Sequence, residues 1–319
     1  MATNWQDWPA RNRADGGTSG PRICTVGHAA VDHCFDIDDF PAQPTKTPAH
    51  RYRMISGGMA SNASIAAARL GAHVRLHGAV GDDEAGAFLA GRLQRDGVDC
   101  AGLQRVPGAS SSISAVVIDA HGERQIFNSR GDALRKAGAL DTAGFDGTHV
   151  VMVDPRWMRG ATEALQWARA HGVLSVLDGD ISPTEDLQAL TTLADWSVYS
   201  EAGLASFAPG LSVPDALRRA LEMGTQMAVV TLGQRGVHWL RKAEGEVSTL
   251  PAFRVKAIDT NGAGDVFHAA LCIALAEGQG ERDAIRFASA AAAIKCQRNG
   301  GVTNGPDRAE LDAFLAANA

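Results

Sequence analysis

Residues 57–97 read GGMASNASIAAARLGAHVRLHGAVGDDEAGAFLAGRLQRDG. Residues 59–71 are rich in alanine and end in Leu-Gly, which predicts a helix that stops at a glycine. Residues 73–80 predict a strand, and residues 84–97 predict a second helix. This stretch therefore predicts a helix, a strand and a helix in direct succession.

The same alternation continues along much of the chain. Further strands are expected at residues 23–27, 148–154, 173–180, 195–200 and 227–233, and further helices at 161–172 and 213–224. Strands that alternate with helices of this length form right-handed βαβ units around a parallel sheet covered on both faces. The prediction is an α/β domain spanning residues 21–319, with a mainly parallel sheet.

Two stretches interrupt this alternation. Residues 33–55 contain several prolines and little helix pattern, and residues 110–130 predict two strands around a His-Gly turn. Neither stretch has a helix to cover it. We expect both to form a small antiparallel sheet that stands off the core and closes over a substrate as a lid.

Composition excludes several classes of protein. The chain has 319 residues and a net charge of −6, which disfavours nucleic acid as a partner. Apolar runs end well before the ~20 residues that a membrane helix needs. The five cysteines lie far apart without a CxxC pair, which argues against a disulfide framework and fits a reducing cytoplasm. Residues 1–20 are polar and predict a flexible tail.

The most informative motif is IDTNGAGDVFHAALCIALA at residues 258–276. Gly262, Ala263 and Gly264 precede a helix, where small residues let backbone N–H groups converge and the helix dipole adds positive potential. This pattern predicts an anion site. Asp265 could take a proton from a hydroxyl beside the anion, as phosphoryl transfer from ATP to an alcohol requires. The alternative is a capped helix in which Asp265 only favours the dipole.

Spacing excludes three other motifs for this segment. A calcium loop counted from Asp259 would need an oxygen ligand at the fifth position and Glu at the twelfth, where Ala263 and Ala270 stand. A dinucleotide-binding fingerprint would place its third glycine on Phe267. A Walker A loop needs Gly-Lys, which does not occur in this chain.

Other candidates lie where an open parallel sheet presents ligands. Asp32 follows the first strand, and Gly57 and Gly58 precede a helix that bears Asn62, whose amide offers a donor and an acceptor. The alternatives are a simple strand-to-helix turn at the glycines and a carboxylate that only faces solvent at Asp32. A later strand ends in a glycine-rich turn with room for nucleotide phosphates, formed by Thr231, Gly233 and Gly236.

With these residues in place, the chain resembles the ribokinase-like (PfkB) carbohydrate kinases over about residues 22–317. The resemblance rests on residues 57–86 and on DTNGAGD at residues 259–265. It implies a ribokinase-like three-layer core with a small β-sheet lid, ATP and Mg²⁺ as cosubstrate, and a sugar hydroxyl as the acceptor. It also implies that Asp265 is the base and that residues 262–264 form the anion hole.

The resemblance also implies the two substrate sites. The sugar would contact Asp32, Gly57, Gly58 and Asn62, and the nucleotide would lie along Thr231, Gly233, Gly236, Gly262 and Gly264. Many members carry Asn-x-x-Glu to position magnesium, whereas this chain has Ser200-Glu201-Ala202-Gly203. The implied metal role therefore falls on Glu201, which is shifted. Whether a monovalent cation takes part stays open.

A closer similarity is to the 6-deoxy-6-sulfofructose kinases of sulfoquinovose breakdown. Four segments carry it: DPRWMRG (154–160), VLDGDISP (176–183), SEAGLA (200–205) and GDVFHAAL (264–271). It implies that Lys46, Asn128 and Arg156 bind a sulfonate, whose three oxygens and negative charge suit an ammonium, an amide and a guanidinium. The alternative is that Lys46 and Arg156 are solvated surface cations.

Alternative functions stay open at this stage. A neutral ketose or a sugar phosphate could replace the sulfosugar, and a sensor without catalysis could use the same fold. The intact Asp265 weighs against a sensor. A homodimer through the lids is expected because the edges of a small sheet favour pairing.

Overall fold

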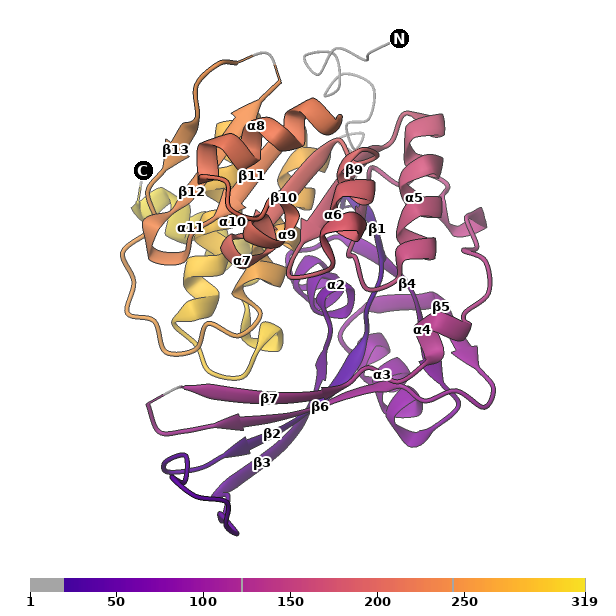
Figure 1. The fold of residues 1–319 in the computed structure, drawn as a ribbon, viewed down its shortest axis with the longest axis vertical. Coiled ribbons are helices and arrows are strands. Elements are labelled where there is room, and N and C mark those ends of the chain that lie inside the picture. The colour runs from indigo at the N-terminus through magenta and orange to yellow at the C-terminus, as the bar shows by residue number, and fades with distance from the viewer. Residues whose placement is uncertain (1–19, 122, 243, 319) are drawn as a thin grey trace.

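The computed structural model describes residues 20–121, 123–242 and 244–318, so the predicted tail lies outside it apart from Gly20. Within these ranges nine strands form one sheet in the order β13-β12-β11-β10-β9-β8-β1-β4-β5 (Figure 1). Neighbours from β5 to β11 run parallel, and β12 and β13 are added antiparallel at one edge. The predicted mainly parallel sheet is confirmed. The strands are β1 Arg22–Val26, β4 His73–Gly81, β5 Val98–Val106, β8 Val150–Val153, β9 Leu174–Gly179, β10 Trp196–Ser200, β11 Met227–Thr231, β12 Val237–Arg241 and β13 Ser248–Leu250.

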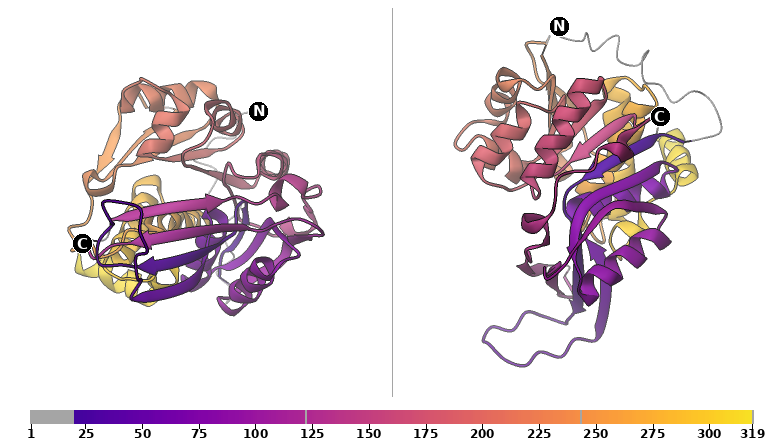
Figure 2. Two further views of the ribbon diagram at one scale, coloured as in Figure 1. Left: turned by 60° about the horizontal axis from the view of Figure 1, so that its bottom comes forward. Right: turned by 90° about the vertical axis from the view of Figure 1, so that its right-hand side faces the viewer.

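Helices cover both faces of this sheet and complete three layers (Figure 2). One face carries α2 Met59–Arg69, α3 Glu84–Arg95, α9 Ala263–Ala276, α10 Glu281–Cys296 and α11 Arg308–Ala317. The other carries α4 Ala133–Lys136, α5 Met158–His171, α6 Thr184–Thr191, α7 Glu201–Phe207 and α8 Val213–Met223. Short 3₁₀ turns are η2 Ala143–Phe145, η3 Gly233–Arg235 and η4 Val302–Asn304. In the described ranges, no helix is long and apolar enough to cross a membrane.

Apolar residues on both sides of each central strand explain why these strands are buried. Val150 and Met152 of β8 pack into the core under α2, α9 and α10, whereas Val151 and Val153 pack into the core under α5. Successive side chains of a strand point to opposite faces, so a strand covered on both faces has a continuous apolar sequence. All four residues of β8 are buried.

The lid is a second sheet that extends away from the core, in the order β3-β2-β6-β7 (Figure 1). The pairs β2–β3 and β6–β7 are antiparallel, as expected. The central pair β2–β6 is parallel, which the sequence did not predict. The reason is that both strands leave the core in the same direction, from Ala30 and Ser112 at the base to Asp36 and Ile118 at the outer end. The lid strands are β2 Ala30–Asp36, β3 Arg51–Gly57, β6 Ser112–Ile118 and β7 Arg124–Ser129.

Candidate active site

The predicted anion site lies at the N-terminus of α9. Gly262 precedes the helix with φ of 75°, and a Cβ at this position would lie 2.5 Å from Cγ1 of Val302. A glycine is therefore required there, because other residues rarely adopt this backbone conformation. A Cβ on Gly264 would meet open space instead, so this part of the turn leaves room for a ligand.

Asp265 stands in the first turn of α9, and its Oδ2 accepts a hydrogen bond of 2.8 Å from Nδ2 of Asn62. Asn62 lies on α2, so the contact joins two predicted site residues that are 203 positions apart. Burial raises the pKa of Asp265 to about 8, helped by the negative charge of Asp178 and opposed by the Asn62 hydrogen bond. A carboxylate with a raised pKa is well suited to accept a proton near neutral pH.

Asp178 and His268 lie behind this base. Asp178 is at the end of β9, and Oδ1 of its carboxylate is 3.5 Å from Nε2 of His268, one turn after Asp265. Nδ1 of His268 bonds the carbonyl of Gly264 at 2.8 Å. Burial, with Asp180 and Asp154 nearby, raises the pKa of Asp178 well above its usual range. His268 is buried against the turn at residues 259–264, which we call the anion turn.

A row of polar side chains crosses the lid beside its base. Asp32 on β2, Ser114 on β6 and Asn128 on β7 occupy matching positions on neighbouring strands. Asn128 donates to Oγ of Ser114 at 3.1 Å, and Ser114 in turn hydrogen bonds Asp32. Gly57 makes room for this row, because a Cβ there would lie 2.2 Å from Oδ2 of Asp32. The structure thus brings together three predicted substrate-binding residues, Asp32, Gly57 and Asn128, and adds Ser114, which was not predicted.

The start of α2 completes this side of the site. Gly58 has φ of 93°, and a Cβ on it would lie 2.5 Å from the carbonyl oxygen of His28. In the described part of the chain, Oδ1 of Asn62 is buried and has no hydrogen-bond partner. A buried acceptor without a partner is costly, so this atom is available for a substrate hydroxyl.

Asp154, which sequence reasoning missed, holds the surrounding segments in place. It is fully buried at the end of β8. Its Oδ2 accepts backbone N–H groups of His28 and Ala60 at 2.8 and 3.1 Å, and its Oδ1 accepts that of Arg156 at 2.8 Å. One carboxylate therefore ties together the link from β1 to β2, the start of α2 and the loop after β8. An acidic residue directly after a buried strand was the available sequence signal.

Arg156 lies at the same end of the sheet. Its side chain is 17% exposed, and Nη1 donates to the carbonyl of Ile181 at 2.8 Å and to Oγ of Ser182 at 3.2 Å. Nη2 lies 3.8 Å from a carboxylate oxygen of Asp180. Arg156 is therefore a largely buried cation held by the loop after β9, and the expectation of a solvated surface arginine does not describe it.

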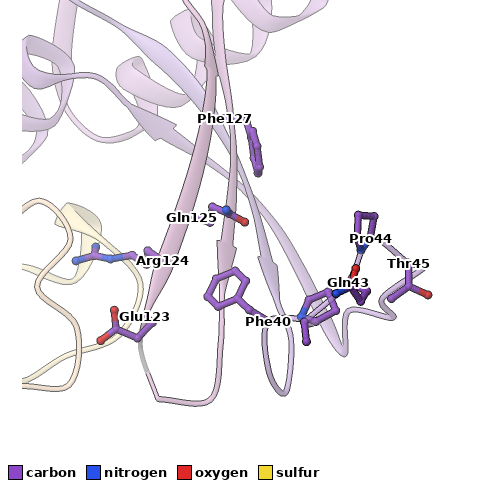
Figure 3. Close-up of a pocket in the computed structure, with 10 residues that line it drawn as sticks. Phe40, Gln43, Pro44, Thr45, Glu123, Arg124, Gln125 and Phe127 are labelled. Carbon is purple, nitrogen blue, oxygen red and sulfur yellow. The ribbon is translucent and has the colours of Figure 1, made fainter.

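Lys46 lies apart from the other sulfonate candidates. It is exposed in the loop that joins β2 to β3, beyond the paired ends Asp36 and Arg51. Four residues of strand, about 13 Å, separate Asp36 from the row at Asp32. The preceding residue, Thr45, lines a cavity of about 750 Å³ at the outer end of the lid, between this loop and β7 (Figure 3).

Four of the five predicted nucleotide residues line one cavity of about 740 Å³ next to α9, whereas Gly262 is not part of its wall. Its wall combines the turn after β11 with the anion turn, and apolar side chains such as Phe253 and Phe267 lie around it. Such a cavity has the size and lining of a site for a flat organic group with phosphates at one end. The wall includes the predicted nucleotide residues Thr231, Gly233, Gly236 and Gly264, together with Ala263 of the predicted anion hole.

Glu201 stands at the start of α7 and forms an ion pair with Arg235, in the glycine-rich turn after β11. Both side chains are more than half exposed. In the residues that the structure describes, no group of three His, Cys, Asp or Glu side chains is arranged to hold a metal ion. The residues therefore do not fit a dedicated metal site, and the implied role of Glu201 stays a prediction.

Comparison with known proteins agrees with this geometry. The model of the pfkB family carbohydrate kinases matches residues 21–308. The chain is 28% identical to the ribokinase of Bacillus subtilis over 301 residues, 92% of this chain and 99% of that protein. It is 30% identical to fructokinase-1 of Zea mays over 283 residues, 80% of this chain and 86% of that protein.

Solved structures show the same architecture. A protein from Agrobacterium tumefaciens, provisionally assigned as a ribokinase, superposes with a TM-score of 0.89 at 35% identity, covering 94% of this chain and 99% of that one. Ribokinase from Thermotoga maritima superposes with a TM-score of 0.78 at 26% identity, covering 93% and 99%. The chain belongs to the pfkB family of carbohydrate kinases. It is a carbohydrate kinase, of ribokinase or fructokinase type.

The pKa of Asp265 leads to a prediction about pH dependence. A base works only when ionised, so kcat/KM should fall as the pH drops through its raised pKa, near 8 rather than near 4. Asp178→Asn removes the neighbouring negative charge and should move this fall to lower pH. The pH profile of kcat/KM measures the shift. Asp215→Asn, an exposed change on α8, should leave the profile unchanged, and an unshifted profile for folded Asp178→Asn would contradict the coupling.

Proposed function

We propose that the chain phosphorylates the 1-hydroxyl of 6-deoxy-6-sulfofructose with ATP, giving 6-deoxy-6-sulfofructose 1-phosphate. The phosphoryl donor is ATP, bound in the cavity beside α9. The sugar lies between the lid row and α2, with its hydroxyl at Asp265 and its sulfonate toward Arg156. The reaction takes place in the cytoplasm, in keeping with five cysteines that form no disulfide.

The observation that carries the choice of an anionic sugar is the pair of arginines around His28. Burial and, to a smaller extent, the positive charges of Arg156 and Arg130 together lower the pKa of His28 to about 4. Arg156 follows a core strand and Arg130 follows the last lid strand, so the charges of two arginines from different parts of the fold both act on His28. A sulfonate there would meet charge-assisted donors.

Each residue has a definite task in this mechanism. Asn62 orients the Asp265 carboxylate through its 2.8 Å hydrogen bond. Asp265 accepts the proton of the attacking hydroxyl, and the hydroxyl oxygen attacks the γ-phosphorus of ATP as the bond to the leaving ADP oxygen breaks. Backbone N–H groups of residues 262–264 and the dipole of α9 stabilise the charge on the transferring group.

Magnesium is proposed to enter with ATP, held by phosphate oxygens and water rather than by a protein cluster. It would neutralise phosphate charge, as it does for nucleotides in general. Glu201 could contact it only through water, because its carboxylate pairs with Arg235.

Two other acceptors remain the main alternatives within the family. A neutral ketose would leave Arg156 and Arg130 without an anion, whereas a sugar phosphate would satisfy both. A sensor without catalysis is disfavoured because Asp265 is both oriented by Asn62 and shifted in pKa toward the working range of a base.

We also propose that two copies associate through their lids. The face of the lid opposite the Asp32 row carries exposed apolar residues: Tyr52, Met54, Ile113 and Phe127. Exposed apolar patches of this kind mark interaction surfaces. Sedimentation at micromolar protein concentration should show a dimer, and a monomer would contradict the proposal.

In the single copy Lys46 lies beyond the Asp32 row, so its contact with the sulfonate requires closure of the lid.

Asp265→Asn tests phosphoryl transfer. The amide cannot accept the proton, so kcat should fall by ~10²–10⁴ while ATP binding stays nearly intact. Coupled detection of ADP release gives kcat, and nucleotide-induced thermal stabilisation reports binding. A variant with kcat within a few-fold of the wild type would contradict the assignment. Asp312→Asn, an exposed change on α11, is the control.

Arg156→Ala tests the identity of the sugar. Loss of a charge-assisted contact should lower kcat/KM for sulfofructose by roughly 10–100-fold, with little change for fructose. Asn128→Ala and Lys46→Ala should act in the same direction, Lys46 more mildly. Arg159→Ala removes an exposed arginine nearby on α5 and should change neither sugar.

Three results would count against the sulfosugar. An equal loss of Arg156→Ala on both sugars would assign Arg156 to the fold or to the ATP site. A wild-type preference for fructose would exclude the sulfosugar and leave the carbohydrate kinase intact. A preference for fructose 6-phosphate would show that the arginines bind a phosphate.

A further inference from the structure

Lys295 is a fully buried cation that the proposed mechanism does not use. It lies near the end of α10 and is 0% exposed, although lysine almost never occurs in protein interiors without a partner. Its Nζ donates to the backbone carbonyl of Asp259 at 2.8 Å and lies 3.3 Å from Oδ2 of the same residue. Both partners of this ammonium therefore belong to one residue, three positions before Gly262.

Asp259 stabilises the anion turn through hydrogen bonds with several backbone groups. Its Oδ1 accepts the N–H of Asn261 at 2.8 Å, and its Oδ2 faces the N–H groups of Gly300 and Gly301 at 3.2 and 3.4 Å. Its own N–H donates to the carbonyl of Cys296 at 3.1 Å. The turn continues as the N–H of residue 263 bonds the carbonyl of residue 260, at the first residue of α9.

A residue of the lid, Arg124, also contacts Asp259 and its neighbour Thr260. Nη2 of Arg124, on β7, donates to Oγ1 of Thr260 at 2.8 Å, and Nη1 lies 3.9 Å from Oδ1 of Asp259. Arg124 is partly exposed, whereas Lys295 is sealed below the turn. Burial lowers the pKa of Lys295 and the Asp259 carboxylate opposes that fall.

We propose that the Lys295 ammonium is a built-in cation that holds the anion turn in its working shape, so that this kinase needs no added monovalent cation. This inference rests on the proposed role of residues 262–264 in phosphoryl transfer, but not on the identity of the sugar. A monovalent cation acting on this turn from below would need oxygen ligands there. The Lys295 ammonium already contacts the two oxygens of Asp259 on that side, the backbone carbonyl oxygen and Oδ2 of the carboxylate. Lys295 is thus a positioning residue, which acts on the reaction through residues 259–264.

The experiment uses the full chain in a buffer with choline as the only monovalent cation, and compares added KCl, NH₄Cl and choline chloride at about 0.1 M to keep screening constant. Wild-type kcat should not respond to K⁺ or NH₄⁺. Lys295→Ala leaves space where the ammonium was, and should lower kcat about tenfold or more with a smaller change in KM for the sugar. K⁺ or NH₄⁺ should restore much of that kcat.

Two variants serve as controls. Lys295→Met fills the space without a charge, so it should lose kcat in the same way but gain nothing from K⁺ or NH₄⁺. Lys242→Ala removes an exposed lysine and should match the wild type under all conditions. A second readout does not depend on turnover: K⁺ or NH₄⁺ should raise the Tm of Lys295→Ala more than choline does, and should not do so for the wild type.

The results of this experiment distinguish a built-in cation from a lysine that only packs. A wild-type kcat that rises several-fold with K⁺ would overturn the proposal, as would a folded Lys295→Met with wild-type kcat. A folded Lys295→Ala that no cation restores, in kcat or in Tm, would show that Lys295 has only a packing role. If neither variant folds, the response of the wild type decides. If sulfofructose is not a substrate, any sugar that the wild type phosphorylates serves, so failure of the sulfosugar proposal leaves this test intact.

Discussion

Asp154 and Asp178 stand at the carboxyl ends of neighbouring parallel strands, almost completely removed from solvent. Burial of like charges in one place opposes their ionisation, and it is this electrostatic constraint that gives the site its properties. Asp154 is satisfied by three backbone N–H groups and so joins three segments. Asp178 has fewer partners, and its charge contributes to the raised pKa of Asp265.

Two buried or nearly buried cations lie beside carboxylates of the site. The charge of Arg156 partly opposes the rise that burial causes in the pKa values of Asp154 and Asp178, and its side chain is held by the loop after β9. Lys295 pairs with Asp259 beneath the anion turn. Breaking such buried pairs by removal of one partner leaves an uncompensated charge, which is why both residues give sharp experimental tests.

Periodicity and spacing were sufficient to predict the alternating strands and helices, the two lid segments and the turn at residues 259–265. They were not sufficient for the order of the lid strands, because the parallel pairing of β2 with β6 joins segments about 80 residues apart and depends on where each leaves the core. Lys295 does carry a sequence signal, a single cation in the apolar run at residues 287–296, but nothing in the sequence identifies its partner as Asp259.

The sequence by itself determined which residues bring chemistry to this protein. Glycines required by positive φ, such as Gly58 and Gly262, and a carboxylate directly after the anion turn are local features, so they can be read from local sequence. The tertiary structure alone decided which of these groups meet. Asn62 reaches Asp265 across 203 positions, and Asp178 lies close enough to contribute to the raised pKa of that base, because charge coupling and burial depend on distance in space rather than along the chain.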